Sequence, residues 1–157
     1  MIKEERKRVE AEQVAKMAKL VDLMVKKPSF VLEADMLYDR YGNSKMVSST
    51  INFILADSTY GVIQVGDNQY LGRNGLGGVT IDGTITSYEY SVKKKNNVYY
   101  LSYTLRSPVG SYDVQLTVQP SGRAEARVNG NFSSGTLRYA GKLVHPAISK
   151  VFQGTSY

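Results

Sequence analysis

Tyrosine is the residue type through which this chain could bind a ligand, because twelve tyrosines accompany four phenylalanines and no tryptophan. A tyrosine ring offers apolar contact area, and its hydroxyl requires a hydrogen-bond partner when the ring is buried. Six of the rings fall on one sheet face, which we take as the inner face: Tyr88, Tyr90, Tyr99, Tyr103, Tyr112 and Tyr139. They could surround a small ligand, or they could fill a core in which the hydroxyls reach backbone groups.

Small residues expected opposite these rings leave the same two alternatives open. Ala124, Ala126 and Gly141 share the inner face in this assignment. Small side chains either make room for large rings or leave a pocket between them. The pattern favours room for the rings, and a pocket is the competing interpretation.

A glycine-rich segment, residues 66–78, could add ligand contacts, because it carries five glycines in thirteen positions together with Tyr70 and Arg73. Phosphate-binding loops use such glycines, but they open a helix and follow a stricter pattern. This segment instead leads into an expected Asp82-Gly83 hairpin turn. We expect a bent loop at a sheet rim, and take Tyr70, Arg73, Tyr99, Tyr103 and Tyr139 as candidate ligand-binding residues.

Residues suited to catalysis are few. The only histidine, His145, precedes a proline, there is no cysteine, and no Gly-x-Ser-x-Gly elbow is present. The strand pattern places Glu33, Asp35, Glu89 and Asp113 on outward faces, where carboxylates are expected to meet water. We therefore expect no enzyme activity, no metal and no cofactor.

The formal net charge of +6 is divided into +3 in residues 1–27 and +3 in residues 28–157, and no dense basic stripe emerges. The densest basic cluster, Lys93 to Lys95, falls where two strands must reverse, which is typical of a solvated hairpin tip. We expect no nucleic-acid partner. No apolar run is long enough for a transmembrane segment.

The elements that must position these residues are predominantly strands. Four segments between residues 86 and 143 alternate apolar and polar side chains with a period of two and are separated by turns. Further strands are expected near residues 30–36, 51–55 and 61–65. Around nine short strands at this spacing predict a mainly β protein, an antiparallel meander that closes into a barrel or a strongly curved sheet.

One amphipathic helix is expected at the N-terminus. Its apolar residues recur at helical spacing up to about Lys26, and Pro28 ends the pattern: Val14, Met17, Ala18, Val21, Met24 and Val25. We expect the stripe to pack on the sheet or to cap a barrel end. The chain then forms a single domain, 1–157, with the helix in 1–27, the barrel in 28–143 and a C-terminal tail in 144–157.

Several segments together resemble a bacterial family known as domain of unknown function 4251. The run at residues 122–129, followed by residues 137–143, is similar to the end of that family's sequences. Residues 30–35, 70–73 and 77–83 resemble its earlier segments in the same order. The similarity covers about residues 10–143. The chain departs from the pattern where Tyr70 lacks a preceding proline, and where residues 131–134 replace a segment that tends to carry an arginine.

The resemblance implies a lipocalin-like barrel with an N-terminal helix, exported in Gram-negative bacteria and often a lipoprotein. Neither a signal peptide nor a lipobox cysteine appears in the chain. The location expected from the family is therefore periplasmic, outer-membrane-associated or secreted if a signal precedes Met1, and cytoplasmic if none does. The family supplies no catalytic residues.

Two functions follow from these observations. The leading hypothesis is a non-enzymatic binding module that holds a small apolar or amphipathic ligand between the helix, the glycine-rich loop and the inner tyrosines. The alternative is a filled barrel that works through its surface, for example on an envelope protein. A solid interior would favour the second hypothesis.

Overall fold

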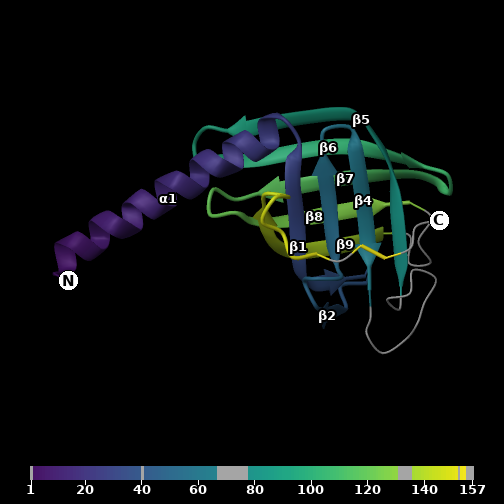
Figure 1. Cartoon of the computed structure of the whole chain (residues 1–157), viewed down its shortest axis with the longest axis horizontal. Helices are drawn as coiled ribbons and strands as arrows, with labels where there is room; N and C mark the ends of the chain where they lie inside the picture. Colours follow the sequence, from purple (N-terminus) through teal and green to yellow (C-terminus); the bar gives the residue numbers. More distant parts are fainter. Residues whose placement is uncertain (1, 40, 67–77, 131–135, 152, 155–157) are drawn as a thin grey trace.

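The computed structural model describes residues 2–39, 41–66, 78–130, 136–151 and 153–154 (Figure 1). Within these ranges the chain forms one helix followed by nine strands. The elements are α1 (Lys3–Lys26), β1 (Ser29–Tyr38), β2 (Ser44–Met46), β3 (Phe53–Asp57), β4 (Tyr60–Val65), β5 (Val79–Lys93), β6 (Val98–Ser107), β7 (Gly110–Val118), β8 (Arg123–Asn129) and β9 (Thr136–Val144).

Eight of these strands close into an antiparallel barrel, which confirms the predicted fold class. The hydrogen-bonded order is β1-β3-β4-β5-β6-β7-β8-β9, and β9 pairs back onto β1 from Val31↔Val144 to Tyr38↔Arg138. The short β2 pairs only with the end of β1 and stays outside the ring. In Figure 1, β1, β3 and β4 cross β6–β9, and the long β5 passes from one layer to the other.

The turn predicted at Asp82-Gly83 is wrong, because both residues lie inside β5. Gly83 pairs with Gly61 and Asp82 with Val62, so the strand continues without a break. A Cβ atom on Gly83 would lie 2.0 Å from the carbonyl oxygen of Arg106. This glycine therefore serves a close backbone approach rather than a turn, as glycines at bends of curved sheets do.

Two bulges change which residues face the core. The pairing of β1 with β9 shifts between Ala34 and Met36. Met36 therefore pairs with the outward Ala140, although an unbroken alternation would put it on the same face as the buried Ala34. A second shift lies in β5 next to Ser87, whose φ is +56°. Beyond it Tyr90 pairs with the inward Leu101, as the inner-face prediction requires, but it is 42% exposed and does not join the buried core.

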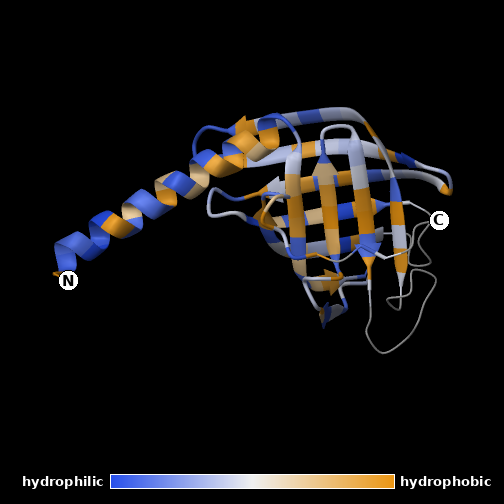
Figure 2. Ribbon diagram, in the orientation of Figure 1, coloured by the Kyte–Doolittle hydropathy of each residue, from blue (hydrophilic) through white to orange (hydrophobic). Residues whose placement is uncertain are grey.

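The C-terminal half of α1 closes one end of the barrel, as expected. Val21, Met24 and Val25 are buried against the inner face. The N-terminal half extends away from the barrel and carries mostly hydrophilic residues (Figure 2). Residues 2–16 are exposed, and Val14, which we expected on the packed stripe, is 63% exposed. Only the part of the apolar stripe in the last turns of the helix therefore packs against the barrel.

The outer surface of the barrel divides into two regions. The first, which we call the covered face, is the outer surface of β1, β3 and β4. Its apolar side chains form a second small core with partly buried residues of β3, β9 and the tail: Val31, Phe53 and Val62, packed with Leu55, Val144 and Val151. The second, the open face, is the outer surface of β5–β9.

Polar contacts hold the C-terminal tail on the covered face. The Ser149 hydroxyl donates to Glu33 Oε2 at 2.7 Å, and the Gly154 amide donates to Gln64 Oε1 at 2.8 Å. Val144 and Val151 pack against the second small core, whereas Ile148 is 67% exposed. Phe152 lies outside the described residues.

Candidate functional site

The barrel interior contains the tyrosines expected to line a ligand site, and three of them have hydrogen-bond partners in the protein. The Tyr139 hydroxyl donates to the Gln64 carbonyl oxygen at 3.0 Å, and the Tyr88 hydroxyl donates to the Val25 carbonyl oxygen at 2.6 Å. The Tyr99 hydroxyl donates to the Asp22 carboxylate on α1. These bonds match the arrangement of a filled core whose hydroxyls reach backbone and helix groups.

Tyr103 differs from its neighbours, because its buried hydroxyl has no hydrogen-bond partner within the described part of the chain. Its ring lies beside that of Tyr88, with centroids 6.0 Å apart. Burial raises the pKa of Tyr103 and of Tyr139 well above the ordinary value, and a charge on Tyr103 would raise the pKa of Tyr139 further. The two phenols therefore share one apolar interior and stay neutral.

Tyr99 occupies the end of the barrel that α1 closes. Burial and the Asp22 carboxylate raise its pKa to about 12. In turn, hydrogen bonds from Lys26 and then Tyr99 lower the pKa of Asp22. This pairing fixes the helix on the barrel mouth, so the contacts of Tyr99 are structural ones.

The small inner residues Gly141 and Ala126 make room for their neighbours. A Cβ atom on Gly141 would lie 1.9 Å from the Glu33 carbonyl oxygen, because β9 meets β1 there to close the barrel. Ala126 lies directly opposite the large ring of Tyr139. Of the two alternatives left open by the sequence, this geometry favours room for the rings.

Tyr70 and Arg73 fall in residues 67–77, outside the described part of the chain. Gly66, which precedes them, is held by the Asn52 side chain. The Asn52 Nδ2 group donates to the Gly66 carbonyl oxygen at 3.1 Å, and Asn52 Oδ1 accepts from the Gly66 backbone amide at 3.0 Å. Gly66 follows the end of β4 that lies away from α1 (Figure 1). The helix and this loop base therefore sit at opposite ends of β4.

Of the residues considered for catalysis, Glu89 and Asp113 line one hollow of about 320 Å³ over β5, β6 and β7, and His145 is not in its lining. His145 Nδ1 accepts a hydrogen bond from the Ala147 amide in the C-terminal turn. Asp35, Glu89 and Asp113 are exposed on outward faces, as predicted. Among the described residues, no group of three or more histidine, aspartate and glutamate side chains is placed to hold a metal ion. In the same ranges, no helix is both long and apolar enough to cross a membrane.

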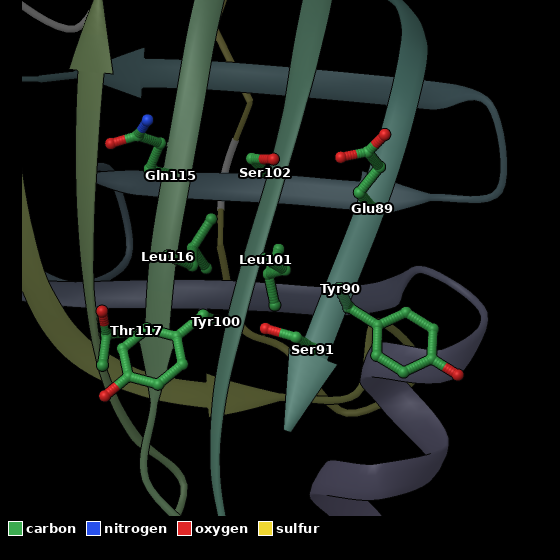
Figure 3. Close-up of a pocket in the computed structure, with 9 residues that line it drawn as sticks. All are labelled: Glu89, Tyr90, Ser91, Tyr100, Leu101, Ser102, Gln115, Leu116 and Thr117. Atoms are coloured by element: carbon green, nitrogen blue, oxygen red, sulfur yellow. The ribbon is translucent and has the colours of Figure 1, made fainter. Parts of the chain in front are cut away.

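The open face carries a polar groove that sequence reasoning did not single out. One hollow of about 370 Å³ spans β5, β6 and β7 (Figure 3). Glu89, Ser102 and Gln115 form one row across these strands, and Ser91, Tyr100 and Thr117 form the next. Tyr100 is 45% exposed, so its ring is available to a ligand at the edge of the hollow.

A second hollow of about 380 Å³ adjoins the first and shares Gln115 and Thr117 with it. It lies over β7, β8 and β9 and extends to Tyr38 on β1. Its polar lining includes Glu125, Arg127 and Arg138. The Arg138 guanidinium lies over the Tyr38 ring, 5.4 Å from the centroid. The two hollows together form what we call the open-face groove.

Polar residues alternate along β6 to β8, and by itself this alternation predicts only an ordinary solvent-exposed face. Their convergence depends on strand register, because the pairing of β8 with β9 places Arg127 opposite Arg138. The bulge in β1 then brings Tyr38 beside Arg138. Neither feature follows from periodicity.

Comparison with known proteins agrees with this architecture. A family model described as domain of unknown function (DUF4251) matches residues 11–143. The crystal structure of a DUF4251 family protein from Bacteroides eggerthii is similar, with a TM-score of 0.73 and 32% sequence identity over 92% of this chain and 99% of that one. No curated protein matches the chain. The sequence resemblance is thereby confirmed, and the chain belongs to the DUF4251 family.

Proposed function

We propose that this barrel is a non-enzymatic binding module that uses the open-face groove to hold a small polar ligand. The observation that carries the proposal is a difference in contacts. The groove is hollowed, most of its lining residues are polar, and no described segment covers it, whereas the hydroxyls of Tyr88, Tyr99 and Tyr139 in the interior are bonded within the protein. Two adjoining hollows of about 370 and 380 Å³ are within the size range of small-molecule sites.

The chemistry of the groove suits a ligand with hydroxyl, amide or charged groups. Ser102, Gln115 and Thr117 offer neutral donors and acceptors in its middle, and Tyr100 offers an exposed ring. These side chains project from paired strands, which hold them in a fixed spacing. A preformed polar surface of this kind can recognise a small molecule without a moving lid.

Native mass spectrometry of the protein purified from its source tests the proposal. We expect a retained small molecule, and we expect Gln115→Trp to abolish its retention because the indole fills the centre of the groove. Arg106→Trp is the matched control, since Arg106 is exposed on β6 outside the linings of both hollows. A preparation without any retained molecule, or retention unchanged by Gln115→Trp, would contradict the proposal.

A second candidate function is a ligand site inside the barrel, for a small apolar or amphipathic molecule. The buried Tyr103 hydroxyl supports it, because an unpartnered buried donor is a feature that a ligand or a buried water can satisfy. In this case Tyr103→Phe, and not Gln115→Trp, reduces retention of the molecule in the same experiment. A third candidate partner is an envelope protein that binds the open face.

We also propose that the protein acts in the periplasm, at the outer membrane or outside the cell. The family membership supports this location through what the resemblance implies about export. Fractionation of cells that express the full native gene, with the protein followed by immunoblot, tests it. Recovery in the cytoplasmic fraction alone would contradict it.

A further inference from the structure

Two arginines stand side by side on the open face. Arg127 on β8 and Arg138 on β9 are direct partners in the antiparallel register. The Cβ atoms of two directly opposite residues lie about 5 Å apart on the same face of the sheet. Two like charges at such positions destabilise the sheet. Both residues are exposed, so the sheet presents two guanidinium groups to solvent from one point.

Neither guanidinium has an ion-pair partner among the residues that the structure describes. Arg138 lies over the Tyr38 ring, which supports it through a cation–π contact but does not cancel its charge. Arg123, on the same face of β8, shows the contrast: it forms a two-point ion pair with Asp35 at 2.7 and 2.8 Å. Arg127 is four residues along the strand and lacks such a carboxylate.

Glu125 is the one carboxylate in the lining of this hollow. It lies between Arg123 and Arg127 on the outer face of β8. Two arginines face a single carboxylate around about 380 Å³ of space. The hollow therefore has an excess of positive charge.

We propose that Arg127 and Arg138 together bind an oxyanion, the carboxylate or phosphate group of the small polar ligand held in the open-face groove. This inference rests on the proposed function and names the charged part of the ligand. Guanidinium groups donate two parallel hydrogen bonds to planar or tetrahedral oxyanions. A bound anion between the two arginines removes their mutual repulsion, and the Tyr38 ring holds Arg138 in place for it.

The test is a two-dimensional NMR titration of the full chain that follows backbone amides and arginine side chains. Inorganic phosphate and acetate are the two probes, and comparing the two titrations separates phosphate binding from carboxylate binding. Sodium chloride at matched ionic strength controls for general screening. We expect saturable shifts at Arg127, Arg138 and Gln115 with one probe or both, and none with chloride.

Variants make the test specific. We expect Arg127→Gln and Arg138→Gln each to weaken binding of the responding probe about tenfold or more, as loss of a charged hydrogen-bond donor does. Arg106→Gln removes the same charge from the same barrel outside the hollow and should leave the dissociation constant unchanged. The melting temperature gives a second readout. We expect phosphate or acetate to raise the melting temperature of the wild type and not that of Arg127→Gln, whereas an arginine pair with only a structural role would show no dependence on the probe.

Three results would overturn the inference: equal shifts with chloride, equal weakening by Arg106→Gln, or no response at Arg127 and Arg138. The proposed function has its own readout. If the probes fail at the arginines while Gln115→Trp still abolishes retention of the native ligand, the oxyanion site is wrong and the groove remains the binding site. If both experiments fail, the proposed function is wrong as well.

Discussion

The covered face and the open face are outer surfaces of the same barrel, yet their strands differ in sequence. β3 contains Phe53, Ile54, Leu55 and Ala56 in succession, and three of the four are buried. β7 alternates instead, with Tyr112, Val114, Leu116 and Val118 buried and the residues between them accessible. An unbroken apolar run needs cover on both sides, whereas an alternating strand needs it on one.

The difference shows what the C-terminal tail is for. It supplies the second cover of β1, β3 and β4 through Val151 and through its bonds to Glu33 and Gln64. No described segment plays the same part over β6, β7 and β8, whose outer residues are polar. The covered face therefore contributes to stability, and the open face is left available for binding.

The largest effect that this comparison predicts is from Phe53→Ala on the covered face. Phe53 is 1% exposed in the second small core, so truncation removes a full ring and leaves a cavity. We expect a loss of about 3–5 kcal/mol in the free energy of unfolding, measured by urea denaturation. Thr117→Ala, at a part-exposed position on the open face, should change it by no more than about 0.5 kcal/mol.

Similar losses from these two variants would mean that the open face is packed against something in solution, for example a second copy of the chain. Repeating the denaturation over a range of protein concentrations separates that case. A concentration-dependent midpoint for the wild type would contradict our description of the open face as uncovered.

A smaller effect on stability is expected from removing tyrosine hydroxyls in the barrel interior, and it should differ between Tyr139 and Tyr103. Tyr139→Phe removes the bond to the Gln64 carbonyl oxygen and should destabilise the protein by about 1 kcal/mol, and at most about 3. Tyr103→Phe, its matched control, removes a buried hydroxyl without a partner and should leave stability unchanged or raise it. Urea denaturation of both variants checks this. Equal losses would indicate that the Tyr103 hydroxyl is bonded, for instance to a buried water.

Much of this architecture could be predicted from local sequence. Two features follow from periodicity and turn chemistry: the helix end near Lys26 and the strand alternation after Val98. The Asp82-Gly83 prediction failed because the same dipeptide serves a tight turn or a close strand approach, and only the register of β5 on β4 and β6 decides between them.

The candidate site could be predicted less well, for a related reason. The sequence indicated inner tyrosines correctly at Tyr99, Tyr103 and Tyr139, but whether such rings fill a barrel or line a cavity depends on packing between strands far apart in the chain. The open-face groove depends on register alone: a shift of two residues in the pairing of β8 with β9 would separate Arg127 from Arg138.

The smallest predicted effect lies where the open face meets β1. Arg123 and Asp35 form their ion pair there with both side chains half exposed, so solvent screens most of the attraction. A double-mutant cycle with Asp35→Asn and Arg123→Gln should give a coupling free energy of about 0.2–1 kcal/mol at neutral pH, decreasing in about 1 M salt.

Its pH dependence provides a sharper test than its size. The hydrogen bonds from Arg123 lower the pKa of Asp35 below the ordinary value of 3.8, so the folded state favours the ionised carboxylate. The coupling should therefore be complete above pH 3.8 and decline as the pH falls through the lower pKa of the folded state. Coupling that persists unchanged at roughly pH 2 would mean that the carboxylate is not what Arg123 recognises. Because Arg127 has no equivalent partner in the described part of the chain, the same cycle between Glu125→Gln and Arg127→Gln should give the weaker coupling of the two, as expected if Arg127 keeps its charge for a ligand.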